Sequence, residues 1–342
     1  MQEKKTIWFL VNPISGTSDK MAIIRSIPQY FPQERFDVRI MCTTHKGHAA
    51  EMASEAAERG VDIVVAVGGD GTVNETARAL IHTQTALGIV PCGSGNGLAR
   101  HLYLPLNTDG ALQVISECNI HTLDYGLING QPFFCTAGVG FDAFLSYKFN
   151  MSNRRGLATY VENALREGVK YQPETYELEI KDDDSENVQT YKAFLITCAN
   201  ASQYGNDFYI APHASMSDGL MDVTIMEPFN LLEAPQIAYQ LVSRTIDSNS
   251  RIKTFRCREM TIHRKQPGVI HYDGDPKESE ADVHVQLVPR DIRMVVNVNK
   301  HPWQPPLLKA FNDLYNDVRG ELQEAPRKIG RVNKEMLRAL RP

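Results

Sequence analysis

A glycine-rich turn between two patterned segments constrains the fold of this chain more than any other feature. The turn spans residues 68–72 (GGDGT) and follows the apolar run 62–67, which predicts a buried strand. Apolar residues then recur at helical spacing over 73–82, which predicts a helix. The first N–H groups of a helix are unpaired and its dipole is positive there, so this turn is suited to bind phosphate.

Two polar positions refine that prediction. Thr72 and Glu75 have the spacing of a capping box, so Thr72 is expected to be the N-cap and the helix to begin after it. Asp70 lies in the middle of the turn, and its carboxylate repels phosphate unless a metal ion or a substrate hydroxyl lies between them. The turn therefore indicates Mg-nucleotide chemistry rather than passive phosphate binding.

Residues 1–125 are predicted to form an α/β domain with a parallel sheet, because short apolar runs alternate with helical patterns. The expected strands are 6–11, 36–42, 62–67 and 86–90, and the expected helices are 18–27, 47–59, 73–82, 96–102 and 109–117. Ligands bind beyond the carboxyl ends of such strands. Four polar or glycine-rich turns follow these ends, at 12–16, 43–47, 68–72 and 91–97, and we expect them to lie along one edge.

Residues 126–300 are predicted to form a β-rich antiparallel, sandwich-like domain. The expected strands are 133–140, 176–180, 191–198, 222–226, 260–263, 283–287 and 292–298, with helical patterns near 156–168 and 231–246. The strand near 291–299 could return to the first domain. Residues 301–342 form a polar, partly helical tail with a basic cluster, for which we expect a solvated helix face or docking onto an anionic membrane.

Charge and composition exclude some classes of protein. The net charge of −5 argues against a nucleic-acid partner, and no apolar run is long enough for a transmembrane segment. The six cysteines show no metal-ligand spacing, which favours free thiols in a reducing compartment. His45 and His48 lie on one helical face without a third ligand, so we expect solvated histidines there. We expect a cytoplasmic protein; peripheral association with the inner face of a membrane and a homodimer are left open.

Four motifs together resemble the diacylglycerol kinase catalytic family, in its bacterial lipid kinase branch, with the sphingosine kinases as relatives. They are Asn12-Pro13-x-Ser15-Gly16, the 68–75 segment GGDGTxNE, Pro91-x-Gly93-Ser94-x-Asn96 and the 218–222 segment DGLMD. The resemblance implies an N-terminal domain like those of NAD kinases and phosphofructokinases. It also implies a C-terminal β-rich domain, with ATP and a lipid headgroup meeting between the two.

The resemblance also implies roles for individual residues. The nucleotide contacts it implies are Asn12, Thr43, Gly68, Gly69, Asp70, Gly71, Thr72, Glu75, Gly93, Ser94 and Asn96. Some have simpler explanations: Thr43 or Thr44 could cap the helix 47–59, and Ser94 and Asn96 could cap the helix 96–102.

The resemblance further implies a structural Mg²⁺ site. The Asp218 carboxylate and the carbonyl groups of Ser215 and Leu220 would ligate the ion, since Mg²⁺ prefers oxygen ligands. The alternative is a turn that merely starts the strand 222–226.

Two carboxylates are candidates for the catalytic base. Asp70 matches the catalytic aspartate of sphingosine kinases, and Asp275 stands where bacterial relatives usually carry glutamate. The side chain of Asp275 is shorter by one methylene, about 1.5 Å of reach. We favour Asp275 as the base, acting with Asp70; the alternative for Asp275 is a surface Asp-Gly hairpin.

The predicted function is therefore an ATP-dependent lipid kinase that phosphorylates a hydroxyl of diacylglycerol or a sphingoid-type lipid at the membrane surface. Two alternatives remain at this point. One is a soluble-substrate kinase of the NAD kinase type, and the other is a catalytically silent nucleotide- or lipid-binding protein.

Overall fold

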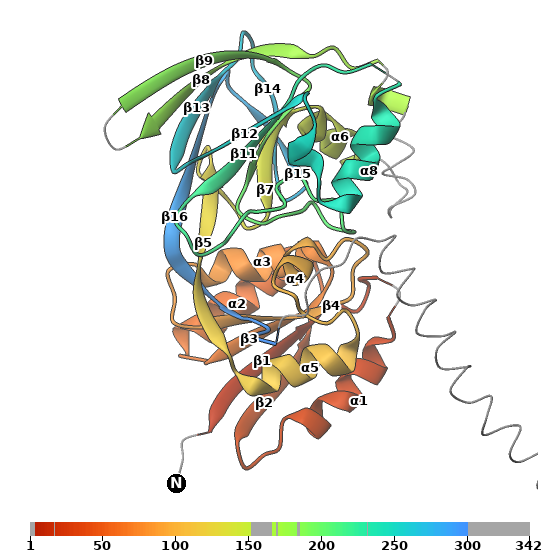
Figure 1. The fold of residues 1–342 in the computed structure, drawn as a ribbon. Helices are drawn as coiled ribbons and strands as arrows, with labels where there is room; N and C mark the ends of the chain where they lie inside the picture. The colour runs from red at the N-terminus through yellow and green to blue at the C-terminus, as the bar shows by residue number, and fades with distance from the viewer. Residues whose placement is uncertain are drawn as a thin grey trace, which may run out of the picture. The chain divides into compact units, whose positions relative to one another are not determined.

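The computed structural model describes residues 4–16, 18–151, 166–168, 170–182, 185–230 and 232–299. Its first part alternates strands and helices (Figure 1), in the order β1 (Lys5–Val11), α1 (Lys20–Tyr30), β2 (Phe36–Cys42), α2 (His48–Glu58), β3 (Ile63–Gly68), α3 (Asp70–Leu80), β4 (Ala86–Pro91), α4 (Gly97–His101) and α5 (Thr108–Glu117). The four strands are parallel in the order β2-β1-β3-β4. The predicted parallel sheet is confirmed, and every bound lies within three residues of its expected position.

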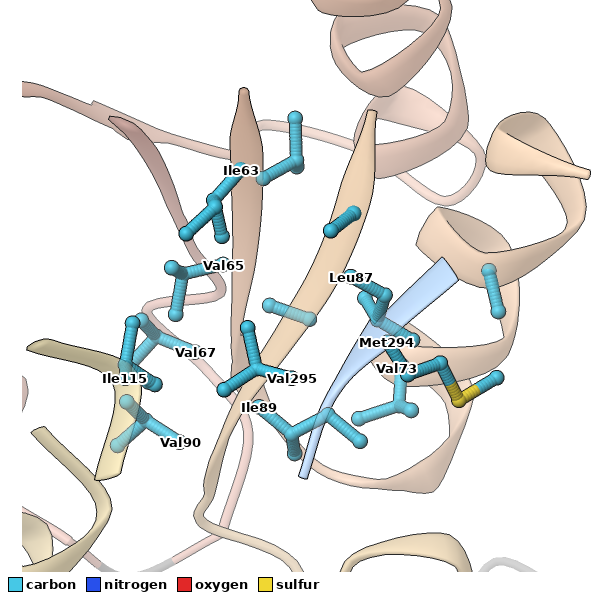
Figure 2. Close-up of a cluster of buried hydrophobic side chains, with 14 of the residues drawn as sticks. Ile63, Val65, Val67, Val73, Leu87, Ile89, Val90, Ile115, Met294 and Val295 are labelled. Atoms are coloured by element: carbon cyan, nitrogen blue, oxygen red, sulfur yellow. The ribbon is translucent and has the colours of Figure 1, made fainter. Parts of the chain in front are cut away.

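Both faces of this sheet are buried, which explains why its central strands are continuous apolar runs rather than alternating patterns. On one face, Val65 and Val67 of β3 and Val90 of β4 pack with Ile115 of α5 (Figure 2). Gly88 of β4 makes room for that helix: a Cβ atom there would lie 3.1 Å from Val65 Cγ2 and 3.6 Å from Ile115 Cγ1. On the other face, α3 contributes Val73 to the same buried core.

The second part is antiparallel, as the sequence predicted. Its elements are β5 (Ile120–Ile128), β6 (Gln131–Phe133), β7 (Thr136–Gly140), α6 (Phe141–Asn150), β8 (Glu174–Asp182), β9 (Ser185–Ala193), β10 (Leu195–Ala199), β11 (Met221–Met226), α8 (Ala234–Ser243), a 3₁₀ turn (Ile246–Ser248), β12 (Ile252–Cys257), β13 (Glu259–His263), β14 (Gly268–Tyr272), β15 (Asp275–Ser279) and β16 (Asp282–Val295). One sheet has the order β12-β11-β10-β7-β14-β15. Its buried residues share a core with β8, β13 and β16 of the other sheet, which makes a sandwich.

Strand β16 links the parallel and antiparallel regions. Its first half pairs with β13, the residues on both sides of its bulge pair with β5, and Met294 pairs with Leu87 of β4. Two separate strands were expected at 283–287 and 292–298, but the structure has one strand with a register shift between Val288 and Ile292. The expected domain boundary at residue 125 lies inside β5.

Four further expectations need comment. The strand expected at 133–140 is two strands, because the backbone N–H groups of residues 134–136 bond to the Asp273 carboxylate at the break. Most of the helix expected at 156–168, and the whole tail from 301 with its basic cluster, lie outside the described residues. Among the helices that the structure describes, none is long and apolar enough to cross a membrane.

One histidine couples the stability of the sandwich to pH. His263 of β13 lies between Asp282 (Nδ1 to Oδ1, 2.8 Å) and Glu179 (Nε2 to Oε2, 3.3 Å). The hydrogen bond with Asp282 raises the pKa of His263 above its ordinary 6.5. A raised histidine pKa stabilises the folded state fully below the unfolded pKa, and that stabilisation is lost as the pH rises through the folded pKa.

We therefore expect His263→Gln to lower the free energy of unfolding at about pH 6 and to have a smaller effect at about pH 8.5. Urea unfolding of the wild type and the variant at several pH values measures the free energy of unfolding at each pH. A difference between wild type and variant that stays constant across this range would show that His263 is not the titrating group.

Candidate active site

The four predicted turns follow the carboxyl ends of neighbouring strands of the parallel sheet, and the first, third and fourth contact one another. In the first, the Asn12 side chain donates from Nδ2 to Thr72 Oγ1 (2.9 Å), and its backbone N–H donates to the carbonyl of Val67 (3.0 Å). Gly16 has a φ of +60°, and a Cβ atom there would lie 1.7 Å from the carbonyl oxygen of Cys92. The first turn therefore packs directly against the third and the fourth, as predicted.

Asp70 ties the third turn to the fourth. Its Oδ2 accepts the backbone N–H of Asn96 and its Oδ1 accepts that of Gly97, both at 2.9 Å. The backbones also approach closely, because a Cβ atom on Gly69 would lie 3.3 Å from the Cα of Gly93. Asp70 is half-buried, and its carboxylate satisfies N–H groups at the start of α4.

The start of α3 differs from the prediction. The helix begins at Asp70 with Gly69 as its N-cap, and no side chain caps it, so the Thr72–Glu75 capping box is wrong. The physical reason is tertiary: Thr72 is buried and its hydroxyl accepts the hydrogen bond of Asn12. The first N–H groups of a helix have no partner inside the helix, so α3 presents donors that suit a phosphate.

The capping alternatives for the other turns also fail. Helix α2 starts after Gly47 without a side-chain cap, and buried Thr43 donates its N–H to the Val11 carbonyl. Helix α4 starts at Gly97, and the Asn96 side chain instead bonds to the N–H and the carbonyl of Gly93.

Some predicted nucleotide contacts have side chains that do not touch the other turns. Ser94 is exposed and Glu75 is half-buried, and the contacts that the structure describes do not join either side chain to the other turns. Gly71 is exposed, and a Cβ atom there would meet nothing within 4 Å, so the space beside the start of α3 is open.

Asp275 begins β15 and contacts helix α3, the helix that starts at Asp70. Its Oδ2 accepts a hydrogen bond from Arg78 Nη2 at 3.2 Å, and its side chain is 54% exposed. The Arg78 guanidinium also lies over the ring of Tyr272, 4.9 Å from the centroid. Arg78 therefore connects α3 to the hairpin that carries Asp275, a link that sequence reasoning missed.

Asp273, another residue that sequence reasoning missed, holds this hairpin in place. Its carboxylate accepts the N–H groups of Phe134 (2.8 Å), Cys135 (2.7 Å) and Thr136 (3.1 Å). Burial raises the pKa of Asp273, while these bonds and Arg78 oppose the rise. The pKa of the Cys135 thiol is raised well above its ordinary value by burial, and further by Asp273 and Asp70, so both carboxylates act on one buried thiol. The Asp273-Gly274 dipeptide, which is typical of a turn, was the sequence feature that could have drawn attention to Asp273.

The segment 200–208 of the β-rich part packs on the fourth turn. The N–H of Asn206 donates to the Gly95 carbonyl (3.0 Å), and Arg100 of α4 pairs with Asp207 (2.7 Å). Ser202 donates its N–H to His101 Nδ1 (3.1 Å). These contacts join the turn after β4 to the antiparallel region, and no motif predicted them.

Protein contacts orient the turn of the predicted cation site. The Asp218 carboxylate pairs with Arg256 and accepts the N–H of Leu220 at 3.2 Å. Fully buried Asp124 holds the turn, since its Oδ2 accepts the N–H of Gly219 (2.8 Å). The two contacts of Asp218 each use one lone pair of a different carboxylate oxygen, so both oxygens keep a second lone pair and Ser215, Asp218 and Leu220 stay the predicted ligands of a Mg²⁺ ion.

Comparison with known proteins agrees with this geometry. Residues 6–128 match the diacylglycerol kinase catalytic domain, and residues 135–296 match the YegS C-terminal NAD kinase beta sandwich-like domain. The chain is 27% identical to a diacylglycerol kinase of Bacillus subtilis, over 78% of this chain and 88% of the relative. It is also 27% identical to the "Probable lipid kinase YegS" of Shigella boydii, over 82% of this chain and 93% of the relative.

A solved structure shows the same fold. The crystal structure of a diacylglycerol kinase from Bacillus anthracis superposes with a TM-score of 0.68 at 19% identity, over 87% of this chain and 98% of that one. The two matched domains follow one another in this chain as the four motifs do. The chain therefore belongs to the diacylglycerol kinase catalytic family, in its bacterial YegS-like lipid kinase branch.

Proposed function

We propose that this chain is an ATP-dependent lipid kinase that phosphorylates a hydroxyl of diacylglycerol or of a sphingoid-type lipid. The observation that carries the proposal is the cluster of strand-end turns around the uncapped start of α3, bridged by Asp70. The relative named diacylglycerol kinase supports the first of these two substrates.

The chain's own residues would hold the nucleotide. The proposed contacts are those of the four turns: Asn12, Thr43, Gly68, Gly69, Asp70, Gly71, Thr72, Glu75, Gly93, Ser94 and Asn96. Bound Mg-ATP would supply the γ-phosphoryl group and a cation that offsets its charge. The first N–H groups of α3 would donate hydrogen bonds to the phosphates, and Asp70 holds the turn after β4 close to the start of this helix. The glycines let the backbone approach closely.

Asp275 is the proposed base. Both oxygens of Asp70 already accept backbone N–H groups, whereas Asp275 is half-exposed and bonds to Arg78 through Oδ2. Oδ1 of Asp275 accepts no hydrogen bond from the part of the chain that the structure describes. The proton of the lipid hydroxyl would pass to this oxygen, while Arg78 positions the carboxylate.

The test is to incubate the purified chain with γ-labelled ATP and Mg²⁺ in three separate reactions, with a total lipid extract, with diacylglycerol and with a sphingoid base. Labelled lipid is the expected product, and its identity names the headgroup. Label in a soluble product alone would support a kinase of the NAD kinase type. ATP binding with no transfer to any acceptor would support a silent binding protein. Either result would overturn the proposal.

A further inference from the structure

Helix α2 brings together two histidines and a carboxylate that the proposed kinase chemistry does not use. They are His45, just before the helix, His48, its first residue, and Glu51, one turn further. One ligand atom from each residue lies within 4.8 Å of the others. The sequence pattern showed only the two histidines, and the fold adds the third donor.

The donor geometry matches a small divalent transition metal. His45 Nε2 and Glu51 Oε2 lie 3.7 Å apart, which is too long for a hydrogen bond. Two ligands about 2.1 Å from a tetrahedral Zn²⁺ lie about 3.4 Å apart. The two imidazole rings are stacked face to face, with centroids 4.7 Å apart and an interplanar angle of 10°, which brings the two histidines into direct contact.

Hydrogen bonds orient the histidine rings. His45 Nδ1 lies 3.1 Å from the Lys46 carbonyl, which can only accept, so Nδ1 carries the proton and Nε2 keeps its lone pair. A backbone carbonyl that fixes the other ring nitrogen is typical of metal-ligating histidine. His48 Nδ1 accepts the N–H of Thr44 (3.1 Å) and lies 3.0 Å from Thr44 Oγ1. Because the Thr44 N–H can only donate, Nδ1 carries the lone pair and Nε2 the ring proton. To ligate through Nε2, His48 must move this proton to Nδ1, which breaks the bond from the Thr44 N–H and lets Nδ1 donate to Thr44 Oγ1.

We propose that His45, His48 and Glu51 form a site for a divalent transition metal, with Zn²⁺ as the ion of matching chemistry. Two imidazoles and one carboxylate make a borderline-soft set of three protein ligands, and water would complete the coordination. His45 and Glu51 are exposed, so the ion has access from solvent. The site is separate from the Asp218 turn and from the start of α3.

A bound ion would cross-link the turn 43–47 to α2. This turn carries Thr43, and His45 lies in it while Glu51 lies within the helix. Because the ion binds the folded arrangement, it should raise the melting temperature. Imidazole ligates in its neutral form, so binding should weaken as the pH falls.

The experiment is isothermal titration of ZnCl₂ into the nucleotide-free chain, in a Cys42→Ser background that removes the exposed thiol. We expect one site whose affinity falls about tenfold or more in His45→Ala and in Glu51→Gln. Both residues are exposed, so these variants should fold. Glu58→Gln on the same helix and His121→Ala on β5 are exposed matched controls and should bind as the parent does. The rise in melting temperature on adding ZnCl₂ should be the same in the parent and the two control variants, and smaller in His45→Ala and in Glu51→Gln.

Two outcomes would overturn the site. The parent chain could fail to bind Zn²⁺ when the concentration of ZnCl₂ is close to the concentration of the protein. Alternatively, His45→Ala and Glu51→Gln could bind as tightly as the two controls, which would place the ion elsewhere. Neither outcome bears on the kinase proposal, since the titration contains no ATP or lipid.

Discussion

Asp70→Asn should lower the rate of lipid phosphorylation by about 10²-fold or more while the chain stays folded. The carboxylate accepts the N–H groups of Asn96 and Gly97, one on each oxygen. An asparagine offers one oxygen, and its NH₂ group would face the second N–H donor. One bond is lost at a cost of about 1–3 kcal/mol, and the turn after β4 moves relative to the start of α3. A steady-state assay and a urea unfolding curve measure both effects.

Asp19→Asn is the matched control for this prediction. Asp19 also accepts two backbone N–H groups, those of Met21 (2.9 Å) and Ala22 (3.3 Å), but both bond to Oδ1, so an asparagine keeps them, and Asp19 caps α1 rather than joining two turns. We expect it to keep activity near that of the wild type. Equal losses of activity in the two variants would mean that removing a carboxylate charge at the start of a helix lowers activity without any loss of the bridge between the turns. Undiminished turnover in Asp70→Asn would remove Asp70 from the mechanism.

The second large effect is expected at Asp275. If this carboxylate accepts the hydroxyl proton, Asp275→Asn should lower kcat by about 10²–10⁴-fold, because an amide cannot act as the base. The side chain is 54% exposed, so the fold should be unaffected. Asp275→Glu keeps the carboxylate and should retain activity within about tenfold, since the exposed side chain has room to adjust.

Arg78→Gln separates positioning from proton transfer. Arg78 bonds to Asp275 Oδ2, and it acts through that carboxylate rather than on the proton. Its loss should therefore lower kcat less than Asp275→Asn does. If Asp275→Asn retains the wild-type kcat, Asp275 is only part of a surface Asp-Gly hairpin.

The parallel half of the fold was predictable because its signals are local. Strand β3 is one continuous apolar run with a glycine turn after it, and α3 buries Val73, Ala77 and Leu80 on one face. The start of α3 was mispredicted, since the hydroxyl of Thr72 is used by Asn12, sixty positions earlier. No local pattern reports such a contact.

The antiparallel half was harder to predict for two reasons. Strand β12 (IKTFRC) buries only its two ends, so its polar middle conceals it. Strand β16 continues through a bulge where Arg290 has a φ of +51°, and the polar residues around this position suggest a break. Tertiary pairing decides both cases.

The candidate site shows the same division between local and tertiary signals. The turns and Asp70 stand out in the sequence as motifs. Arg78, Asp124 and Asp273 do not, because their roles depend on partners in distant elements: Asp275, Gly219 and the N–H groups after β6. Asp70 itself was predicted to lie among amide donors, and it does, although the amides it binds belong to the neighbouring turn.

The central claim is that these turns build one site that passes a terminal phosphate to a lipid. The most direct test compares ATP labelled at the γ-phosphate with ATP labelled at the α-phosphate, and measures the label in the organic phase after extraction with lipid present. We predict transfer from γ-labelled ATP only, and its loss in Asp70→Asn and Asp275→Asn. An organic phase free of γ-label with the wild-type chain, in the presence of Mg²⁺ and the total lipid extract, would contradict the account.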